Sequence, residues 1–230
     1  MSINTEKYTS LLAELDGKAI LVAVSKTKPI EDIQALYNLG QRDFGENYVQ
    51  ELVDKAASLP KDIRWHFIGH LQSNKVKYIA PFVYLIHGVD SLSLLKEINK
   101  QGAKNNRVIN CLLQIHIAKE ETKFGFNEKE LSELQGLHEL KNIRIVGMMG
   151  MASFSEDKAL VRTEFAGLKS VLDANAGLIQ SMKTPAKEAT APTTPVLSMG
   201  MSADYAIALE EGSNMVRIGS LLFGERESTR

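Results

Sequence analysis

Short apolar runs alternate with longer segments of mixed polar and apolar residues along most of the chain. In the longer segments, such as 30–40, 92–102 and 128–140, apolar residues return every three or four positions, which is the spacing of an amphipathic helix. Several of these segments end at or near glycine, as helices commonly do. The apolar runs have the length of strands and occupy residues 19–25, 42–47, 64–69, 83–90, 108–117, 143–151, 195–200 and 214–220. This alternation is typical of parallel strands joined by crossover helices.

Eight strand and helix units predict a closed barrel. A TIM-type (β/α)8 barrel typically takes about 250 residues, and this chain has 230, so we favour that α/β fold over an open doubly wound sheet. An extra helix is predicted over 4–16, ahead of the first strand. Residues 183–195, rich in Ala, Thr and Pro, predict a mobile loop rather than a linker, because two more units follow them. The predicted organisation is one domain spanning 1–230.

Charge and composition restrict the partners. The 27 Lys and Arg residues are balanced by 28 Asp and Glu residues along the whole length, so no basic stripe predicts nucleic acid as a partner. No run approaches the roughly 20 apolar residues of a membrane span, and the N-terminus lacks an apolar signal core. We therefore expect a soluble cytoplasmic protein with no membrane contact. The single cysteine, Cys111, lies in an apolar run and is expected to be a core residue.

Two small polar turns follow the seventh and eighth predicted strands, where (β/α)8 barrels frequently bind phosphate. In the first turn, Gly200 would let the backbone approach a ligand, and Ser202 is placed to cap the next helix, with amide groups directed outward. The second turn repeats the arrangement with Gly219 and Ser220 after Arg217. Each could be an ordinary capped turn. Their occurrence together in these two loops favours a site for one phosphate monoester.

A lysine ends the first apolar run, and barrel closure would bring it beside the last run. Lys26 would then neighbour Arg217, and a nearby cation together with partial burial favours the uncharged, nucleophilic amine. Lys28 is the competing candidate, but it lies about 6–7 Å farther along an extended chain, beyond the rim. An amine beside a phosphate site predicts a Schiff base with a phosphorylated aldehyde. The alternative is a solvated lysine at a strand end.

Other strand ends add polar groups whose role the sequence leaves open. Asn47, Ser73 and Ser91 could contact a ligand or simply cap helices. His66 and His70 have the four-residue spacing of a helical zinc pair, but they fall on a strand and a turn, where that spacing does not converge on one ion. No metal site is predicted.

Seven separated motifs occur in the order and form of a known family. They are AVSKTKP (23–29), FGENYVQE (44–51), WHFIGHLQSNK (65–75), TKFGF (122–126), GMMGM (147–151), LSMGMSADY (197–205) and GSNMVRIGSLLFG (212–224). Together they resemble the pyridoxal 5'-phosphate (PLP) homeostasis protein family, also described as proline synthetase co-transcribed homologues, over about residues 18–224. The resemblance implies the fold of the alanine racemase N-terminal barrel, that of the fold-type III PLP enzymes, with PLP held as a Schiff base.

The resemblance also implies roles for individual residues. Lys26 of AVSKTKP would form the Schiff base, and Arg217 of VRIGS would face the pyridine nitrogen. Asn47 of FGENYVQE and Met148 of GMMGM are weaker candidates for the surroundings of the ring. The phosphate would be surrounded by Ser198, Ser202, Gly219 and Ser220.

An arginine beside the ring nitrogen would disfavour protonation of that nitrogen, so PLP would be a weak electron sink. The resemblance implies proteins without an established catalytic activity that carry PLP or regulate vitamin B6 and amino-acid pools. We therefore predict intracellular PLP homeostasis by a protein that holds PLP and delivers it to apo-enzymes. A monomer is expected, because the racemase β-domain that contributes to a dimer has no counterpart in the sequence.

Two alternatives stay open at this point. One is a racemase-like PLP enzyme that uses a local base such as Tyr48, Tyr205 or His70. The other is a class I aldolase in which Lys26 acts directly on a sugar phosphate. A visible absorption band would distinguish the PLP interpretations from the colourless aldolase.

Overall fold

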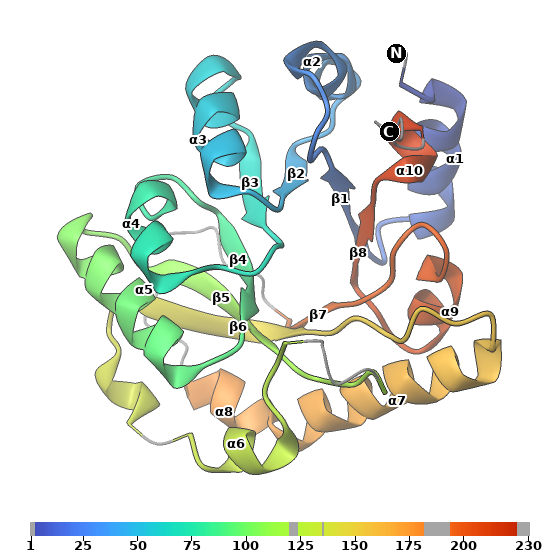
Figure 1. Cartoon of the computed structure of the whole chain (residues 1–230). Helices are drawn as coiled ribbons and strands as arrows, with labels where there is room; N and C mark the ends of the chain where they lie inside the picture. The colour runs from blue at the N-terminus through green and yellow to red at the C-terminus, as the bar shows by residue number, and fades with distance from the viewer. Residues whose placement is uncertain (1–2, 120–123, 135, 182–193, 225–230) are drawn as a thin grey trace, which may run out of the picture.

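The computed structural model describes residues 3–119, 124–134, 136–181 and 194–224. Its centre is a closed barrel of eight parallel strands that follow one another in chain order (Figure 1). The strands are β1 (Ile20–Val24), β2 (Asp43–Glu46), β3 (Arg64–Phe67), β4 (Leu85–Val89), β5 (Ile109–Gln114), β6 (Ile143–Met149), β7 (Val196–Ser198) and β8 (Met215–Ile218). The predicted TIM-type (β/α)8 barrel is confirmed, and each predicted run contains one strand.

The first and last strands close the barrel side by side. β1 pairs in parallel with β8, with Val22 opposite Arg217 and Ala23 opposite Ile218. The predicted proximity of the Lys26 turn to Arg217 therefore follows from the hydrogen-bonded register of these two strands. β1 is a nearly continuous apolar run because one of its faces packs inside the barrel and the other packs against helices.

Helices cover the outside of the barrel (Figure 1). The predicted N-terminal helix is α1 (Thr5–Leu15), and Asn4 caps it by accepting a hydrogen bond from the backbone of Lys7. Asn4 N also donates to Leu222 O at 2.8 Å, which fixes the start of α1 on α10. The remaining helices are α2 (Ile30–Asn38), α3 (Val49–Ser58), α4 (Val76–Ile79), α5 (Leu92–Lys104), α6 (Glu128–Ser132), α7 (Lys158–Ala174), α8 (Ala176–Ser181), α9 (Tyr205–Glu210) and α10 (Ser220–Phe223), with 3-10 turns η1 (Ser73–Lys75) and η2 (Leu137–Glu139).

Buried apolar side chains form two layers that the strands divide. The inner cluster fills the barrel with Val22, Leu85, Leu112, Val146, Met149, Val196 and Met215. The larger layer lies between strands and helices and includes Phe44 and Phe165. Successive residues of a strand face opposite layers, so Val22 is inside the barrel while Leu21 and Ala23 face the helices. This alternation decides which side chains reach the opening of the barrel.

Two sequence predictions differ from the structure or fall outside it. The helical period over 128–140 does not make one helix: α6 ends at Ser132, and η2 follows Gly136, whose φ of 70° cannot continue a helix. Of the loop predicted over 183–195, residues 183–193 lie outside the described residues. Cys111 is fully buried in the outer layer, as predicted.

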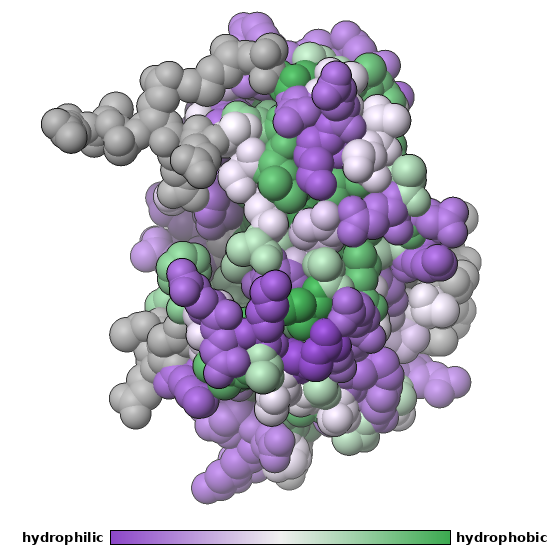
Figure 2. Space-filling view, turned by 90° about the vertical axis from the view of Figure 1, so that its right-hand side faces the viewer, coloured by the Kyte–Doolittle hydropathy of each residue, from purple (hydrophilic) through white to green (hydrophobic). Residues whose placement is uncertain are grey.

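The distribution of apolar side chains on the surface and in the helices bears on whether the described residues could cross a membrane. On the face shown in Figure 2, polar side chains surround small, separate apolar areas. In the described part of the chain, no helix combines the length and the apolar character that crossing a membrane requires.

Candidate functional site

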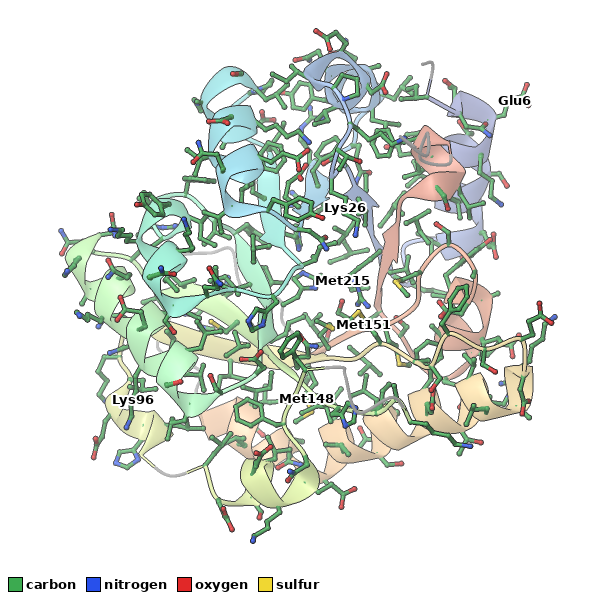
Figure 3. The ribbon with its side chains drawn as sticks, viewed as in Figure 1. Glu6, Lys26, Lys96, Met148, Met151 and Met215 are labelled. Carbon is green, nitrogen blue, oxygen red and sulfur yellow. The ribbon has the colours of Figure 1, made fainter. Side chains whose placement is uncertain are left out.

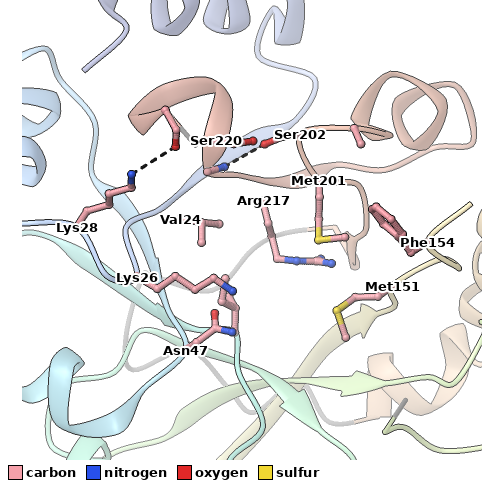
Figure 4. A pocket seen from close by; sticks show the side chains of 14 residues that line it. Val24, Lys26, Lys28, Asn47, Met151, Phe154, Met201, Ser202, Arg217 and Ser220 are labelled. Carbon is pink, nitrogen blue, oxygen red and sulfur yellow. Dashed lines mark hydrogen bonds between the residues drawn. The ribbon is translucent and has the colours of Figure 1, made fainter. Parts of the chain in front are cut away.

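A cavity of about 470 Å³ opens at the C-terminal ends of the strands, where β1 and β8 meet (Figure 4). This volume lies within the roughly 300–1,000 Å³ of small-molecule sites. Six of the predicted site residues line it, namely Lys26, Asn47, Ser202, Arg217, Gly219 and Ser220. Among the described residues, its lining has three cationic side chains, with Lys28 the third, and no carboxylate. The cavity therefore suits an anionic ligand.

The turn that carries Lys26 is fixed on both sides of that residue. Ser25 Oγ donates to Glu46 Oε1 at 2.6 Å, and the backbone N of Thr27 donates to Glu51 Oε1 at 2.6 Å. Thr27 has a φ of 61°, a left-handed conformation that a β-branched residue adopts only when its surroundings impose it. Lys26 extends from this turn into the cavity (Figure 4). Its backbone position is therefore set before any ligand binds.

A buried ammonium group joins the two carboxylates that hold this turn. Lys55 Nζ lies 2.8 Å from Glu46 Oε1 and 2.6 Å from Glu51 Oε1, and it also donates to Ser25 O at 2.8 Å. Burial raises the pKa of Glu46, although the charge of Lys55 opposes that shift. The sequence shows this network only as an i,i+4 pair of Glu51 and Lys55, an ordinary spacing on a helix.

Lys28, the competing lysine, has a different place. Its Nζ donates to Phe223 O at 2.9 Å and to Gly224 O at 3.3 Å, at the C-terminal end of α10 (Figure 4). It lies at the edge of the cavity, and its ammonium group is used to join the first loop to the last helix. Of the two lysines, Lys26 is the one whose side chain extends toward Arg217 (Figure 4).

Arg217 is a buried cation with neutral partners. The residue is 4% exposed, and its guanidinium donates to Ser198 Oγ at 2.7 Å and to Gly150 O at 3.1 Å. Burial lowers the pKa of Arg217 to about 10, and the charge of Asp204 opposes that shift. The group therefore stays charged at neutral pH. None of the carboxylates in the described residues forms an ion pair with it, so its charge faces the cavity without a direct counter-ion.

The two predicted phosphate turns meet through a hydrogen bond. Gly219 N donates to Ser202 Oγ at 3.3 Å, and Ser220 begins α10 beside it (Figure 4). The predicted capping role of Ser202 is wrong, because the next helix begins at Tyr205 and has Asp204 at its N-cap position. Ser202 therefore joins the two loops instead of capping one helix.

Gly200 also differs from its predicted role. Its φ is 94°, and a Cβ atom there would come within 2.6 Å of Ala208 Cβ and 3.0 Å of Tyr205 Cα. The missing side chain thus lets α9 pack closely on the end of β7. The sequence signal was correct about a close approach, but the approaching group is a helix of the same chain.

Asn47 carries an acceptor that the fold leaves unused. Its Oδ1 is buried, and no hydrogen-bond partner for it exists among the described residues. Buried polar atoms in native proteins are nearly always hydrogen-bonded. Because Asn47 lines the cavity next to Lys26 (Figure 4), a bound ligand can supply the missing partner.

Two predicted site residues do not line the cavity. Ser198 is fully buried below Arg217, and its hydroxyl contacts Arg217 Nη1 and His87 Nδ1. Met148 is fully buried in the layer that faces the helices. Met151, three residues later on the chain, lines the cavity instead (Figure 3).

The sequence prediction missed the apolar side of the cavity. Met151, Met201 and Phe154 lie across from Lys26 and Asn47 (Figure 4). Phe154 is 97% exposed, an unusual state for a phenylalanine. A flat ring can be bound between such an apolar side and the polar side formed by Lys26, Asn47 and Arg217.

The three local bases considered from the sequence lie outside the described lining. His70 Nδ1 is 3.1 Å from Asp90 Oδ2, and its ring stacks on Phe124. Tyr205 donates to Glu14 Oε2 at 3.0 Å, on α1. His66 is buried inside the barrel, with Asp43 and His87 as its partners. No group of three or more metal-ligating side chains occurs among the described residues.

The barrel and its cavity define a class of proteins. Residues 4–227 match the family described as alanine racemase, N-terminal domain. The alanine racemase of Bartonella henselae, solved with covalently bound pyridoxal phosphate, has the same fold at 18% identity and a TM-score of 0.69, covering 95% of this chain and 58% of that one. The chain is thus an alanine racemase N-terminal-type barrel.

Within that class the relatives agree on a name. Pyridoxal phosphate homeostasis proteins of Aquifex aeolicus and Homo sapiens are 42% and 38% identical to the chain over 211 and 221 residues, or 91% of the chain and 88% and 78% of theirs. The structure of PipY from Synechococcus elongatus with PLP bound matches with a TM-score of 0.83 at 33% identity, covering 95% of this chain and 99% of that one. The chain belongs to the pyridoxal phosphate homeostasis protein family.

Proposed function

We propose that this protein binds PLP in the cavity at the ends of β1 and β8, keeps it there through Lys26, and passes it to apo-enzymes. The observation that carries the proposal is the cavity itself, which combines a lysine amine with a buried guanidinium that has no carboxylate partner among the described residues. PLP supplies an aldehyde that an amine can capture and a phosphate that needs cationic or amide donors. The PLP-bound PipY structure and the names of the relatives support the same ligand.

The residues of the cavity fit the parts of PLP. The amine of Lys26 would take the aldehyde, and the loops joined by Ser202 and Gly219 would surround the phosphate together with Ser220. The unused acceptor of Asn47 is available to the polar substituents of the ring. Met148 and Ser198 have no place in this assignment, because neither lines the cavity.

The arginine supports holding PLP rather than using it. A guanidinium that keeps its charge at neutral pH does not accept a proton, and it disfavours a second positive charge nearby. If Arg217 faces the ring nitrogen, that nitrogen stays unprotonated and the ring withdraws electrons weakly. Such a site favours storage of PLP over catalysis of carbanion chemistry.

We propose that the protein acts in the cytoplasm as a monomer and that apo-enzymes which need PLP are its transient partners. On the face shown in Figure 2, the apolar areas are scattered rather than joined into one patch, which supports a monomeric state.

A spectrum of the purified protein with PLP tests the binding site. We expect a visible absorption band for the wild-type chain, loss of that band in Lys26→Ala and its retention in Lys28→Ala. Borohydride reduction followed by peptide mass spectrometry should place the pyridoxyl group on Lys26. A colourless wild-type protein, or a label on Lys28, would contradict the proposal.

Transfer is tested separately. The PLP-loaded protein is mixed with an apo-enzyme across a measured time course, and recovery of enzyme activity reports delivery. An equal amount of PLP trapped by borohydride in the same protein serves as the control and should deliver none. Rapid α-proton exchange of an amino acid in deuterated water, with no delivery, would instead favour the racemase-like alternative.

A further inference from the structure

A chain of buried hydrogen bonds crosses the inside of the barrel and ends at the cavity. Arg217 Nη1 donates to Ser198 Oγ at 2.7 Å, and Ser198 Oγ lies 3.1 Å from His87 Nδ1. His87 Nε2 lies 2.9 Å from His66 Nδ1, and His66 Nε2 lies 2.9 Å from Asp43 Oδ1. All five residues are buried and stand on five different strands, β8, β7, β4, β3 and β2.

At Asp43, the end of the hydrogen-bond chain that is farther from the cavity, an ion pair holds the carboxylate. Arg64 donates through Nε to Asp43 Oδ1 at 2.7 Å and through Nη2 to Oδ2. Both residues lie at the first positions of their strands, at the opposite end of the barrel from the cavity. The chain therefore connects the N-terminal end of the barrel with the site at the C-terminal end.

The direction of every bond follows from the arginine. A guanidinium has donors only, so Ser198 Oγ accepts from Arg217, and among its side-chain partners in the described residues only His87 Nδ1 can accept the serine hydrogen. His87 then carries its proton on Nε2 and donates it to His66 Nδ1. His66 in turn carries its proton on Nε2 and donates it to Asp43, whose carboxylate is an acceptor. Each donor finds an acceptor only in this direction.

An additional proton on His87 would disrupt this direction of the hydrogen bonds. If His87 carried a proton on Nδ1, that nitrogen would donate to Ser198, and the serine hydrogen would have no acceptor among its partners in the described residues. His87 faces the charged Arg217 beyond Ser198, His66 on β3, and through it Asp43 and Arg64. Burial lowers the pKa of His87 well below its ordinary value, which agrees with a neutral ring.

We propose that His87 and His66 are positioning residues of the cavity. The one-way chain that they form with Asp43 keeps the Ser198 oxygen available to Arg217 and so holds the guanidinium where it faces the ligand. This inference rests on the proposed PLP function only for its effect on the ligand. The arrangement of protons is a property of the protein by itself.

The first test measures the tautomers in the full-length protein without PLP. Nitrogen-15 NMR of histidine-labelled chain should show both rings neutral, with the proton on Nε2 and a bare Nδ1, at neutral pH. Assignment uses His66→Asn and His87→Asn. A proton on Nδ1 of either ring, or an imidazolium at His87, would overturn the proposal. Because no PLP is present, this result does not depend on whether the protein binds PLP.

The second test compares variants for PLP affinity and for the position of the absorption band. His87→Leu removes the acceptor of Ser198, and we expect PLP to bind roughly tenfold more weakly, the scale of one hydrogen bond to a charged group, with a shifted band. His87→Asn keeps an acceptor near the position of Nδ1 and should restore most of the affinity. Ser198→Ala supplies the same test should His87→Leu fail to fold.

Leu85→Ala is the matched control. Leu85 lies two residues before His87 on β4 and faces the same interior, but it has no part in the chain. We expect it to lower thermal stability and leave PLP affinity unchanged. Wild-type affinity and band in both His87→Leu and Ser198→Ala, or an equal loss in Leu85→Ala, would show that the histidines only fill space. A wild-type protein that binds no PLP would instead refute the proposed function.

Discussion

Among the described residues, two buried cations lie near the site, and their surroundings are opposite. Lys55 lies against Glu46 and Glu51 and below the turn that carries Lys26. Arg217 lies at the cavity with a serine hydroxyl and a backbone carbonyl as partners. Both are at most 5% exposed. One charge is compensated within the fold, whereas the other has no ion pair among the described residues.

This difference separates a structural charge from a functional one. Removing an ion from water costs several kcal/mol, and a nearby opposite charge offsets that cost. Lys55 has that offset twice, so it requires no ligand. Arg217 has no ion pair among the described residues, and only the charge of Asp204 acts on it from beyond ion-pair distance, so an anionic ligand would lower the free energy of the site when it binds. The comparison therefore predicts that the Lys55 network supports stability and that Arg217 supports binding.

The largest effect is expected at Lys55. Lys55→Met leaves Glu46 and Glu51 without their cation, and breaking a buried pair from one side costs about 3–5 kcal/mol of unfolding free energy. Urea unfolding of the variant and the wild type measures the difference. PLP affinity should also fall, because Glu46 and Glu51, which hold Ser25 and Thr27 in the Lys26 turn, lose the cation that positions them.

Arg217→Met is the matched comparison. It leaves Ser198 Oγ and Gly150 O without a donor but removes a buried charge, so the loss of stability should be clearly smaller than for Lys55→Met. PLP affinity should fall more than stability does. Equal destabilisation by the two variants would refute the distinction between these cations.

The next effect is expected at Asp43, the ionised end of the hydrogen-bond chain that supports Arg217. Burial alone would raise the pKa of Asp43, but hydrogen bonds from Arg64 and His66 outweigh it and lower the pKa from 3.8 to about 2. A carboxyl group with a lowered folded-state pKa stabilises the protein above its unfolded pKa and loses that contribution as pH falls. The shift corresponds to about 2 kcal/mol, lost between about pH 4 and pH 2.

Asp43→Asn tests this assignment. The variant should be less stable than the wild type at pH 6, and the gap should close as the pH approaches 2. Denaturant unfolding between pH 6 and pH 3 measures the trend. A gap that stays constant across this range would show that Asp43 does not contribute through its charge.

A smaller effect is expected at His87. Its pKa is lowered in the fold, so below an ordinary value of 6.5 the unfolded chain binds a proton that the folded chain does not. The contribution of neutral His87 to the free energy of unfolding is therefore fully present above about pH 6.5, and it falls by about 1.4 kcal/mol for each pH unit below that value. His87→Asn should remove this slope between pH 6.5 and 5.5. His138→Asn, at an exposed position, is the control and should keep the slope.

The sequence predicts the barrel and much of the site, and the reasons are visible in particular residues. Eight apolar runs of strand length imply closure, and closure alone places Lys26 near Arg217. The resemblance implied Met148 for the surroundings of the ring, whereas Met151 lines the cavity; the run over 143–151 is apolar on both faces, so the sequence does not show which of its side chains face the inside of the barrel. A register shift between Cys111 and Leu112 alters the pairing of this strand further.

The buried hydrogen-bond chain from Arg217 to Asp43 could not be predicted from the sequence, for a related reason. His66 and His87 are 21 residues apart and meet only because both face the inside of the closed barrel. The resemblance implied a phosphate contact for Ser198, yet this residue lies one layer below the cavity. Depth within a barrel depends on register and tilt, and neither is encoded in a local motif.

The smallest effect is expected at Lys28, a third cation near the site. Lys28 Nζ donates to two backbone carbonyls and, within the described part of the chain, to no carboxylate, as Arg217 donates to uncharged oxygens, but Lys28 is only partly buried. Solvent then compensates its charge, so Lys28→Ala should cost only about 1 kcal/mol, from loosened contacts with α10. PLP affinity should change by less than about threefold, a difference below 1 kcal/mol. A loss of affinity as large as that in Arg217→Met would mean that burial is not what distinguishes the binding cation.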